Sequence, residues 1–252
     1  MKTFTIGKKK IVLKEEWMVG FITTWIVGLL AHAYRFFNFL PIWDSIYNFT
    51  GVGSTYTLGR WFLGYAGLIT SMFDLPWVNG AFSLFYISIV VILLTEMFEI
   101  KNKGMIVLCA AIFVSFPTVV SSFAYMYTAD AYLLAFLLAT LAVYLTWCVK
   151  KWGTIAGMVC LAFAMGIYQA YATVAIVLVL LYIIRQFVIE KLDFLEAVRK
   201  DLKYLGMLVG GAVLYAVILK ITLIRYNITL PGRRMILWKY PLRITDAVCL
   251  RK

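Results

Sequence analysis

Few polar residues of this chain stand where they could do chemistry, and the carboxylate of Asp44 is the clearest of them. It lies in Pro41-Ile42-Trp43-Asp44-Ser45, directly after an apolar run, with aromatic residues around it and no base beside it. A carboxylate in such a place can take a proton from a hydroxyl group that attacks another molecule. The alternative is an N-cap role for a short helix from Asp44 to Asn48. We expect Asp44 to be catalytic, and the two roles are compatible.

Arg60 is the second candidate, in the segment Leu58-Gly59-Arg60-Trp61. An isolated guanidinium can hold a phosphate through two parallel hydrogen bonds. The alternative is an arginine whose charged end simply reaches the lipid headgroups. The sequence leaves both interpretations open.

A further group of polar side chains could contact a substrate. Tyr127 and Asp130 are three residues apart and share a helical face. The alternative for Asp130 is a carboxylate favoured at a helix N-terminus. Tyr168 and Gln169 lie in Tyr168-Gln169-Ala170-Tyr171, which supplies phenol and amide groups. Its alternative is an aromatic belt at the membrane interface.

Several classes of chemistry are excluded. His32 is the only histidine, so neither a histidine metal cluster nor a Ser-His-Asp triad can form. No phosphate-binding glycine motif is present, and the four cysteines fall singly with no C-x-x-C spacing. We therefore expect no cofactor and no protein metal ligands, although one or two carboxylates could hold a hydrated divalent ion with a substrate phosphate.

The elements that must position these side chains are membrane-spanning helices. Of 252 residues 63% are hydrophobic and only 14% are charged, with a mean hydropathy of +0.90, whereas soluble domains are roughly 25% charged. The fold class we expect is all-α and polytopic, with about seven spans plus an outer interfacial helix and an inner amphipathic helix. The expected spans are Trp17–Leu40, Trp77–Phe98, Met105–Ser122, Ala129–Cys148, Thr154–Met165 with its continuation, Tyr171–Ile184 and Tyr204–Leu223.

Basic residues predict the orientation of these spans. The net charge of +12 gathers in short segments between them, which indicates membrane topology rather than binding of nucleic acid. We expect a cytoplasmic basic N-terminus at 1–16 and a membrane domain at 17–224. That domain includes an outer loop at 41–76, with an interfacial helix in Trp61–Phe73, and a cytoplasmic amphipathic segment at 185–203.

The tail at 225–252 departs from this rule, because it carries seven basic residues on the side assigned as outer. Either the tail contacts an anionic partner or the reading frame ends abnormally. We expect the second.

Short motifs in a fixed order carry a family resemblance over roughly residues 17 to 225. They are Asp44 after the first span, Gly59-Arg60-Trp61, Pro76-Trp77-Val78-Asn79-Gly80, Phe123-Ala124-Tyr125-Met126-Tyr127-Thr128-Ala129-Asp130 and Ile167-Tyr168-Gln169-Ala170. Together they resemble the bacterial O-antigen glucosyltransferase II family, whose members are polytopic and similar in plan to the GT-C glycosyltransferases.

The resemblance implies a transferase in the bacterial inner membrane. It would move glucose or a related hexose from a polyprenyl-phosphate-sugar donor to the O-antigen of lipopolysaccharide or another surface glycan, on the outer side. Asp44 would be the catalytic carboxylate and Arg60 would suit the donor phosphate. Two departures are visible: Ser45 follows Asp44 where members often have an acidic pair, and members are usually longer.

Two other functions compete with this interpretation. A lipid-sugar flippase or transporter would also place polar groups between spans, but usually near the bilayer midplane and with internal repeats. An inactive, truncated family member is the other alternative. We expect the transferase, because a lipid-linked donor needs no nucleotide motif.

Overall fold

The computed structural model describes residues 2–6, 9–47, 55–70, 72–191 and 194–228. The described chain is helical apart from a short antiparallel hairpin of β1 (Lys2–Ile6) and β2 (Lys9–Leu13), in which Lys2 lies opposite Leu13. The predicted all-α class is thus confirmed. The hairpin itself was not expected from the sequence.

Seven longer helices form the body of the described part of the chain. They are α1 (Glu15–Phe37), α4 (Pro76–Met97), α5 (Lys103–Ser115), α7 (Met126–Cys148), α8 (Gly153–Ile167), α9 (Ala172–Arg185) and α10 (Phe194–Arg225). The short elements between them are α2 (Trp43–Tyr47), α3 (Leu63–Ala66), α6 (Pro117–Ala124), the 3-10 turn η2 (Gln169–Tyr171) and the π-helical turn η3 (Gln186–Glu190).

The described helices have the length and composition of a multi-pass membrane protein. Six helical segments are long and apolar enough to cross a bilayer, and α8 is a shorter apolar helix. Large apolar side chains cover the outer faces of these helices, such as Leu30 at 77% exposure. In lipid such a surface is compatible with its surroundings, whereas in water it would drive aggregation.

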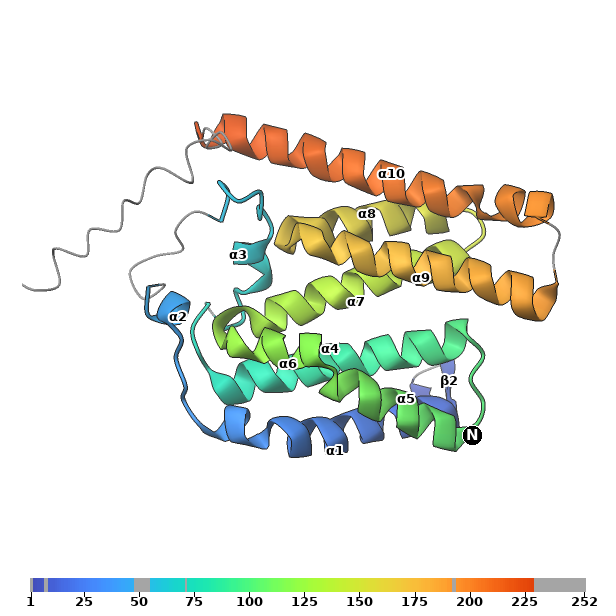
Figure 1. The fold of residues 1–252 in the computed structure, drawn as a ribbon, viewed down its shortest axis with the longest axis horizontal. Helices are drawn as coiled ribbons and strands as arrows, with labels where there is room; N and C mark the ends of the chain where they lie inside the picture. Colours follow the sequence, from blue (N-terminus) through green and yellow to red (C-terminus); the bar gives the residue numbers. More distant parts are fainter. Residues whose placement is uncertain (1, 7–8, 48–54, 71, 192–193, 229–252) are drawn as a thin grey trace, which may run out of the picture.

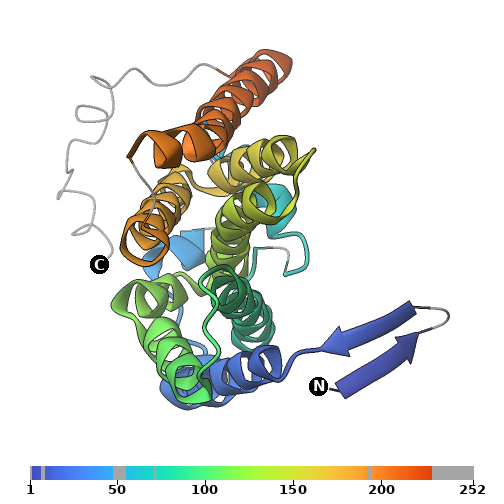
Figure 2. The same ribbon diagram turned by 90° about the vertical axis from the view of Figure 1, so that its right-hand side faces the viewer.

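The helices form an elongated row with α7 near its centre (Figures 1 and 2). α7 packs against α4 on one side and against α8 on the other; α1 and α5 lie beyond α4, and α10 lies beyond α8. Small residues allow close approach, since a Cβ on Gly28 of α1 would lie 2.4 Å from a methyl carbon of Leu84 in α4. The row is therefore held together by side-chain packing between neighbouring helices.

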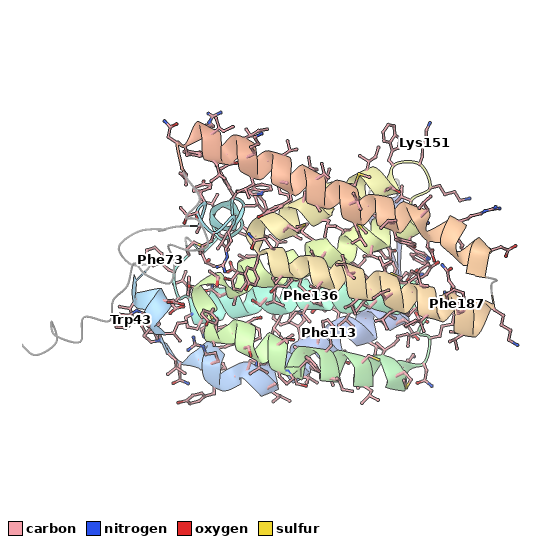
Figure 3. The ribbon with its side chains drawn as sticks, turned by 45° about the horizontal axis from the view of Figure 1, so that its top comes forward. Trp43, Phe73, Phe113, Phe136, Lys151 and Phe187 are labelled. Atoms are coloured by element: carbon pink, nitrogen blue, oxygen red, sulfur yellow. The ribbon has the colours of Figure 1, made fainter. Side chains whose placement is uncertain are left out.

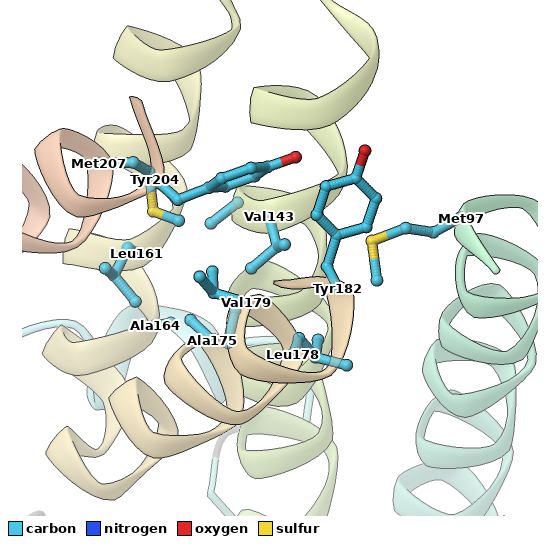
Figure 4. Packing of buried hydrophobic residues seen from close by; sticks show 12 residues of the cluster. Met97, Val143, Leu161, Ala164, Ala175, Leu178, Val179, Tyr182, Tyr204 and Met207 are labelled. Atoms are coloured by element: carbon cyan, nitrogen blue, oxygen red, sulfur yellow. The ribbon is translucent and has the colours of Figure 1, made fainter. Parts of the chain in front are cut away.

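A large buried cluster joins α7, α8, α9 and α10 (Figure 4). Tyr182 of α9 and Tyr204 of α10 meet within it, with ring centroids 5.6 Å apart. Leu161 of α8 and Val143 of α7 pack nearby. This cluster fixes the position of α10 on the bundle. α10 in turn supports the loop that carries Arg60, described below.

Successive helices run in opposite directions, so the segments that connect them gather at the two ends of the row. These two ends differ in their chemistry. One, the hairpin end, carries residues 2–6, 9–14, 98–102, 149–152 and 186–191; the other, the cavity end, carries 38–47, 55–70, 72–75, 116–125 and 168–171. Figure 3 shows Lys151 and Phe187 at the hairpin end and Trp43 and Phe73 at the cavity end. Ion pairs Lys14–Glu96, Lys103–Glu15 (2.7 Å) and Arg185–Glu99 (2.9 Å) all lie toward the hairpin end.

Three elements differ in extent from the sequence prediction. In the described part of Trp61–Phe73, the expected interfacial helix is reduced to the four-residue α3, which ends at Ala66. The expected span Met105–Ser122 is broken into α5 and α6, because Pro117 cannot continue the helical hydrogen bonds of α5.

The amphipathic segment is not a separate helix either. Its second part forms the first turns of α10, which continues without a break to Arg225. No glycine or proline lies between Phe194 and Leu205 to interrupt it. The tail at 229–252 lies outside the described residues.

Candidate active site

A cavity of about 590 Å³ opens at the cavity end, between α2, the segment before α3, α6, α7 and α9. Its polar lining combines one carboxylate, one guanidinium, five phenols and four hydroxyls. These are Asp44, Arg60, Tyr125, Tyr127, Tyr132, Tyr168, Tyr171, Thr118, Ser121, Ser122 and Thr173. The predicted residues Asp44, Arg60, Tyr127 and Tyr168, which come from four separate parts of the chain, thus share one cavity.

Arg60 is held by two tyrosines. Its Nη1 donates a hydrogen bond to the Tyr132 hydroxyl at 3.2 Å, and its Cζ lies 4.5 Å from the centroid of the Tyr168 ring. The two rings stack on each other with centroids 5.5 Å apart. The Arg60 Nε is buried without a hydrogen-bond partner, and none of the ion pairs within the described ranges involves Arg60. A partly buried cation in this state favours an anionic ligand.

The turn before Arg60 is anchored from two other elements. Gly59 has a φ of +76°, a conformation that favours glycine. Gln169 donates from Nε2 to the Leu58 carbonyl at 2.8 Å and to the Tyr215 hydroxyl at 2.9 Å, and Tyr215 donates to the Gly59 carbonyl at 3.0 Å. Gln169 and α10 therefore hold the loop that carries Arg60.

The residues on either side extend this anchoring. Trp61 is buried and packs on Gly166 of α8, where a Cβ would lie 2.6 Å from the indole ring. The Phe62 amide donates to the Gly166 carbonyl at 2.8 Å. Upstream, Tyr56 stacks on Tyr226 with centroids 5.2 Å apart, and burial raises the pKa of the Tyr56 phenol. Arg60 thus projects from a segment fixed on both sides.

Asp44 is presented by the short helix α2. Ser45 closes the turn that starts it, because its Oγ accepts from the Ile42 amide at 2.9 Å and donates to the Ile42 carbonyl at 2.8 Å. Asp44 lies inside the first turn of α2, rather than at an N-cap position, and its side chain is exposed. The carboxylate is accordingly accessible at the mouth of the cavity.

The hydroxyl groups of the lining face the cavity mainly as acceptors. Ser121 and Ser122 of α6 donate to the carbonyls of Pro117 and Thr118 at 2.8 and 2.9 Å. Thr173 of α9 donates to the Ala170 carbonyl at 2.6 Å. Because the protons of these three hydroxyl groups are used by the backbone, their remaining lone pairs can accept hydrogen bonds from a hydroxylated ligand.

Asp130 and Gln169 do not line the cavity. Asp130 is 3% exposed and accepts hydrogen bonds from Thr70 Oγ1 and Asn79 Nδ2, each at 3.2 Å. It joins α7 to α4 and to the segment after α3. Although Tyr127 and Asp130 are three residues apart, only Tyr127 reaches the cavity.

Sequence reasoning missed Tyr125, Tyr132 and the hydroxyls of α6 as lining residues. The seven-residue spacing of Tyr125 and Tyr132 is a signal that could have been used, since residues seven apart share a helical face. The α6 hydroxyls carried no such signal, because their placement depends on the break at Pro117. Among the residues that the structure describes, no group of three or more His, Cys, Asp or Glu side chains could hold a metal ion.

Residues 33–237 match the family described as glucosyl transferase GtrII. The chain belongs to the GtrII glucosyl transferase family. The match begins inside α1 and extends past α10, so it includes every residue that lines the cavity. No match was found among the curated proteins or among the solved structures. Membership confirms the resemblance seen in the sequence motifs and indicates a glucosyltransferase.

Proposed function

We propose that this GtrII family chain transfers glucose or a related hexose from a polyprenyl-phosphate-linked donor to O-antigen or another surface glycan, with the cavity as its active site. The observation that carries the proposal is that an exposed carboxylate, Asp44, and the guanidinium of Arg60, whose Nε has no hydrogen-bond partner, line one cavity rich in tyrosines. A lipid-linked donor also accounts for a membrane chain without a nucleotide-binding motif.

The step assigns one role to each charged group. Asp44 takes the proton from an acceptor hydroxyl, whose oxygen forms a bond to the anomeric carbon of the donor sugar. The bond from that carbon to the phosphate oxygen breaks, and the electron pair leaves with the polyprenyl phosphate. Arg60 binds the phosphate and stabilises the charge that develops on it. Tyr127 offers its ring to the sugars, whereas the ring of Tyr168 lies against Arg60 and Tyr132 and contributes its phenol hydroxyl to the cavity.

The other two residues predicted from the sequence, Gln169 and Asp130, act by positioning other parts of the chain. Gln169 positions the Arg60 loop through its bonds to Leu58 and Tyr215. Asp130 joins α7 to α4 beneath the cavity. Both are positioning residues in this proposal.

The orientation follows from charge. Lys101, Lys103, Lys150, Lys151 and Arg185 lie at or beside the hairpin end. Basic loops stay in the cytoplasm, so the hairpin end and the N-terminus are cytoplasmic and the cavity opens on the outer side. Lipid-linked donor and growing glycan can meet there. The plan resembles that of GT-C transferases.

The test is transfer of labelled glucose from polyprenyl-phosphate glucose to glycan in membranes that contain the chain. Asp44→Asn should lower the rate by about 100-fold or more, because the general base is lost. Glu16→Gln is the control, a carboxylate in the first turn of α1 at the hairpin end that does not line the cavity. Equal transfer by wild type and Asp44→Asn would contradict the role of Asp44. Movement of the lipid-sugar across vesicles without transfer would instead support a flippase.

A further inference from the structure

The wall of the cavity formed by α6 is attached to the rest of the molecule in an unusual way. α6 is eight residues long and is separated from α5 at Phe116 and from α7 at Tyr125, whose backbone angles are not helical. Its carbonyl groups and those just before it therefore lack the partners that a continuous helix would provide. Side chains near the C-terminal end of α1 supply several of these hydrogen-bond partners.

His32 of α1 hydrogen-bonds to the backbone at the break before α6. Its Nε2 lies 2.9 Å from the carbonyl oxygen of Val114, one of the last residues of α5. In a continuous helix that carbonyl would accept from the amide of residue 118, across the position that Pro117 interrupts. Because a carbonyl can only accept, His32 donates from Nε2.

Arg35, one turn further along α1, hydrogen-bonds to the backbone at the other end of α6. Its Nε donates to the Phe123 carbonyl at 2.8 Å and its Nη2 to the Ala124 carbonyl at 3.0 Å. Its Nη1 donates to the carbonyl of Leu40. Leu40 begins the segment that leads into α2 and Asp44, so one guanidinium ties the α6 wall to the segment that carries the proposed base.

The ring of Phe123 completes the attachment. It is 2% exposed and lies between His32 and Phe36 of α1, with centroid distances of 4.5 and 5.1 Å. The opposite side of α6 carries Thr118, Ser121 and Ser122 into the cavity. α6 is thus held by contacts on the face toward α1. Its other face, which carries the hydroxyl groups, lines the cavity and can contact a ligand.

We propose that Arg35, assisted by His32, is a positioning residue of the active site, which sets the distance between the hydroxyl face of α6 and the Asp44 segment. This inference rests on the proposed function, since it assumes that the cavity is where transfer occurs. Neither residue lines the cavity. The acceptor hydroxyl must be held by α6 and deprotonated from α2, so a shift between these two elements lowers turnover without weakening capture of the donor phosphate at Arg60.

The first test compares Arg35→Met, Arg35→Lys and the neighbouring control Tyr34→Phe in steady-state transfer. Arg35→Met should lower kcat by about 10- to 100-fold, because small misplacements of reacting groups are costly, while the donor KM stays within about twofold of wild type. Arg35→Lys, which retains a cation but lacks the planar fork that reaches the three carbonyls, should recover part of the rate. A donor KM that rises with unchanged kcat would overturn the proposal.

The second test does not depend on activity. Hydrogen exchange in detergent should accelerate over residues 117–124 and 38–47 in Arg35→Met, and over 117–124 in His32→Phe, while α7 stays as in wild type. Unchanged exchange in α6, or a uniform acceleration that includes α7, would overturn the positioning role. If no variant and no wild type transfers sugar, the proposed function fails, yet the exchange data still decide whether α1 holds α6.

Discussion

At the scale of single residues, Arg60 is the group whose surroundings define its chemistry most closely. One of its nitrogens donates to Tyr132, its Cζ lies over the ring of Tyr168, and its Nε has no partner. The tyrosines orient the guanidinium without neutralising it, since phenols are uncharged at neutral pH. The site therefore keeps a full positive charge for an anionic ligand.

Replacing this charge should affect the donor first. Arg60→Met should raise the donor KM and lower kcat/KM for transfer by about 100-fold, which corresponds to the loss of charge-assisted hydrogen bonds to a phosphate. Arg60→Lys should lose less. Arg225→Met, at the end of α10 and outside the cavity lining, is the control. Arg60→Met with wild-type donor kinetics would argue against a phosphate at this position.

The aromatic partner can be tested separately. Tyr168→Phe keeps the ring that lies against Arg60 and should transfer within about threefold of wild type, because the cation–π contact is retained. Tyr168→Leu removes it and should lose about tenfold in kcat/KM. Steady-state rates of the two variants give the comparison. An equal loss in Tyr168→Phe and Tyr168→Leu would assign the importance to the hydroxyl, which both variants lack.

At the scale of elements, the Arg60 loop depends on a glycine and on helix α10. A Cβ on Gly59 would lie 2.6 Å from Gln169 Nε2 and 2.7 Å from the Tyr215 hydroxyl, and the φ of +76° disfavours any other residue. The loop is thus shaped by contacts between segments more than 100 residues apart in sequence.

Gly59→Ala should therefore reduce transfer more than it reduces stability. The strain amounts to about 1–2 kcal/mol, and the displaced anchors misalign Arg60, so we expect at least a tenfold loss of kcat/KM. Gly64→Ala, in the same segment, is the control, because nothing lies within 4 Å of a Cβ there. Thermal unfolding in detergent measured beside transfer separates the two effects. Equal transfer by both variants would contradict this view of the loop.

For Asp130 the prediction concerns the stability of the fold rather than the rate of transfer. Asp130→Leu would leave the buried Asn79 amide without its acceptor and Thr70 with only the Gly67 carbonyl at 3.4 Å, at a cost of about 1–3 kcal/mol for the lost amide bond. The melting temperature should fall by several degrees, and Asp130→Asn, which retains one acceptor oxygen, should fall less. An Asp130→Leu variant as stable as wild type would show that these bonds do not support the fold.

The sequence predicted the elements better than their junctions. Runs of apolar residues located the seven long helices, because membrane length and hydropathy constrain them strongly. The break at Pro117, the shortness of α3 and the continuity of α10 were not predicted, since each depends on which neighbours satisfy the backbone. In the site, Asp44 and Arg60 stood out as isolated charges. The α6 hydroxyls and the role of Arg35 could not be predicted, because carbonyl partners leave no pattern in a single sequence.

At the scale of the whole molecule, the two ends of the helix row should face opposite sides of the membrane. In a cysteine-free background, Lys151→Cys at the hairpin end should react with a membrane-impermeant maleimide only after the membrane is opened. Trp43→Cys at the cavity end, where the native side chain is 74% exposed, should react in intact spheroplasts. The charge distribution is the reason for this prediction. The reverse pattern would place the cavity in the cytoplasm and remove the proposed meeting point of donor and glycan.

The measurement that tests the division of roles most directly is binding of polyprenyl-phosphate glucose to the purified protein, with transfer measured on the same samples. Asp44→Asn should bind the donor with the wild-type Kd and fail to transfer, because a base acts only in the reaction step. Arg60→Met should bind weakly and fail in both assays. If Asp44→Asn transfers normally, or if Arg60→Met binds the donor as well as wild type does, the assignment of base and phosphate-binding cation to this cavity is wrong.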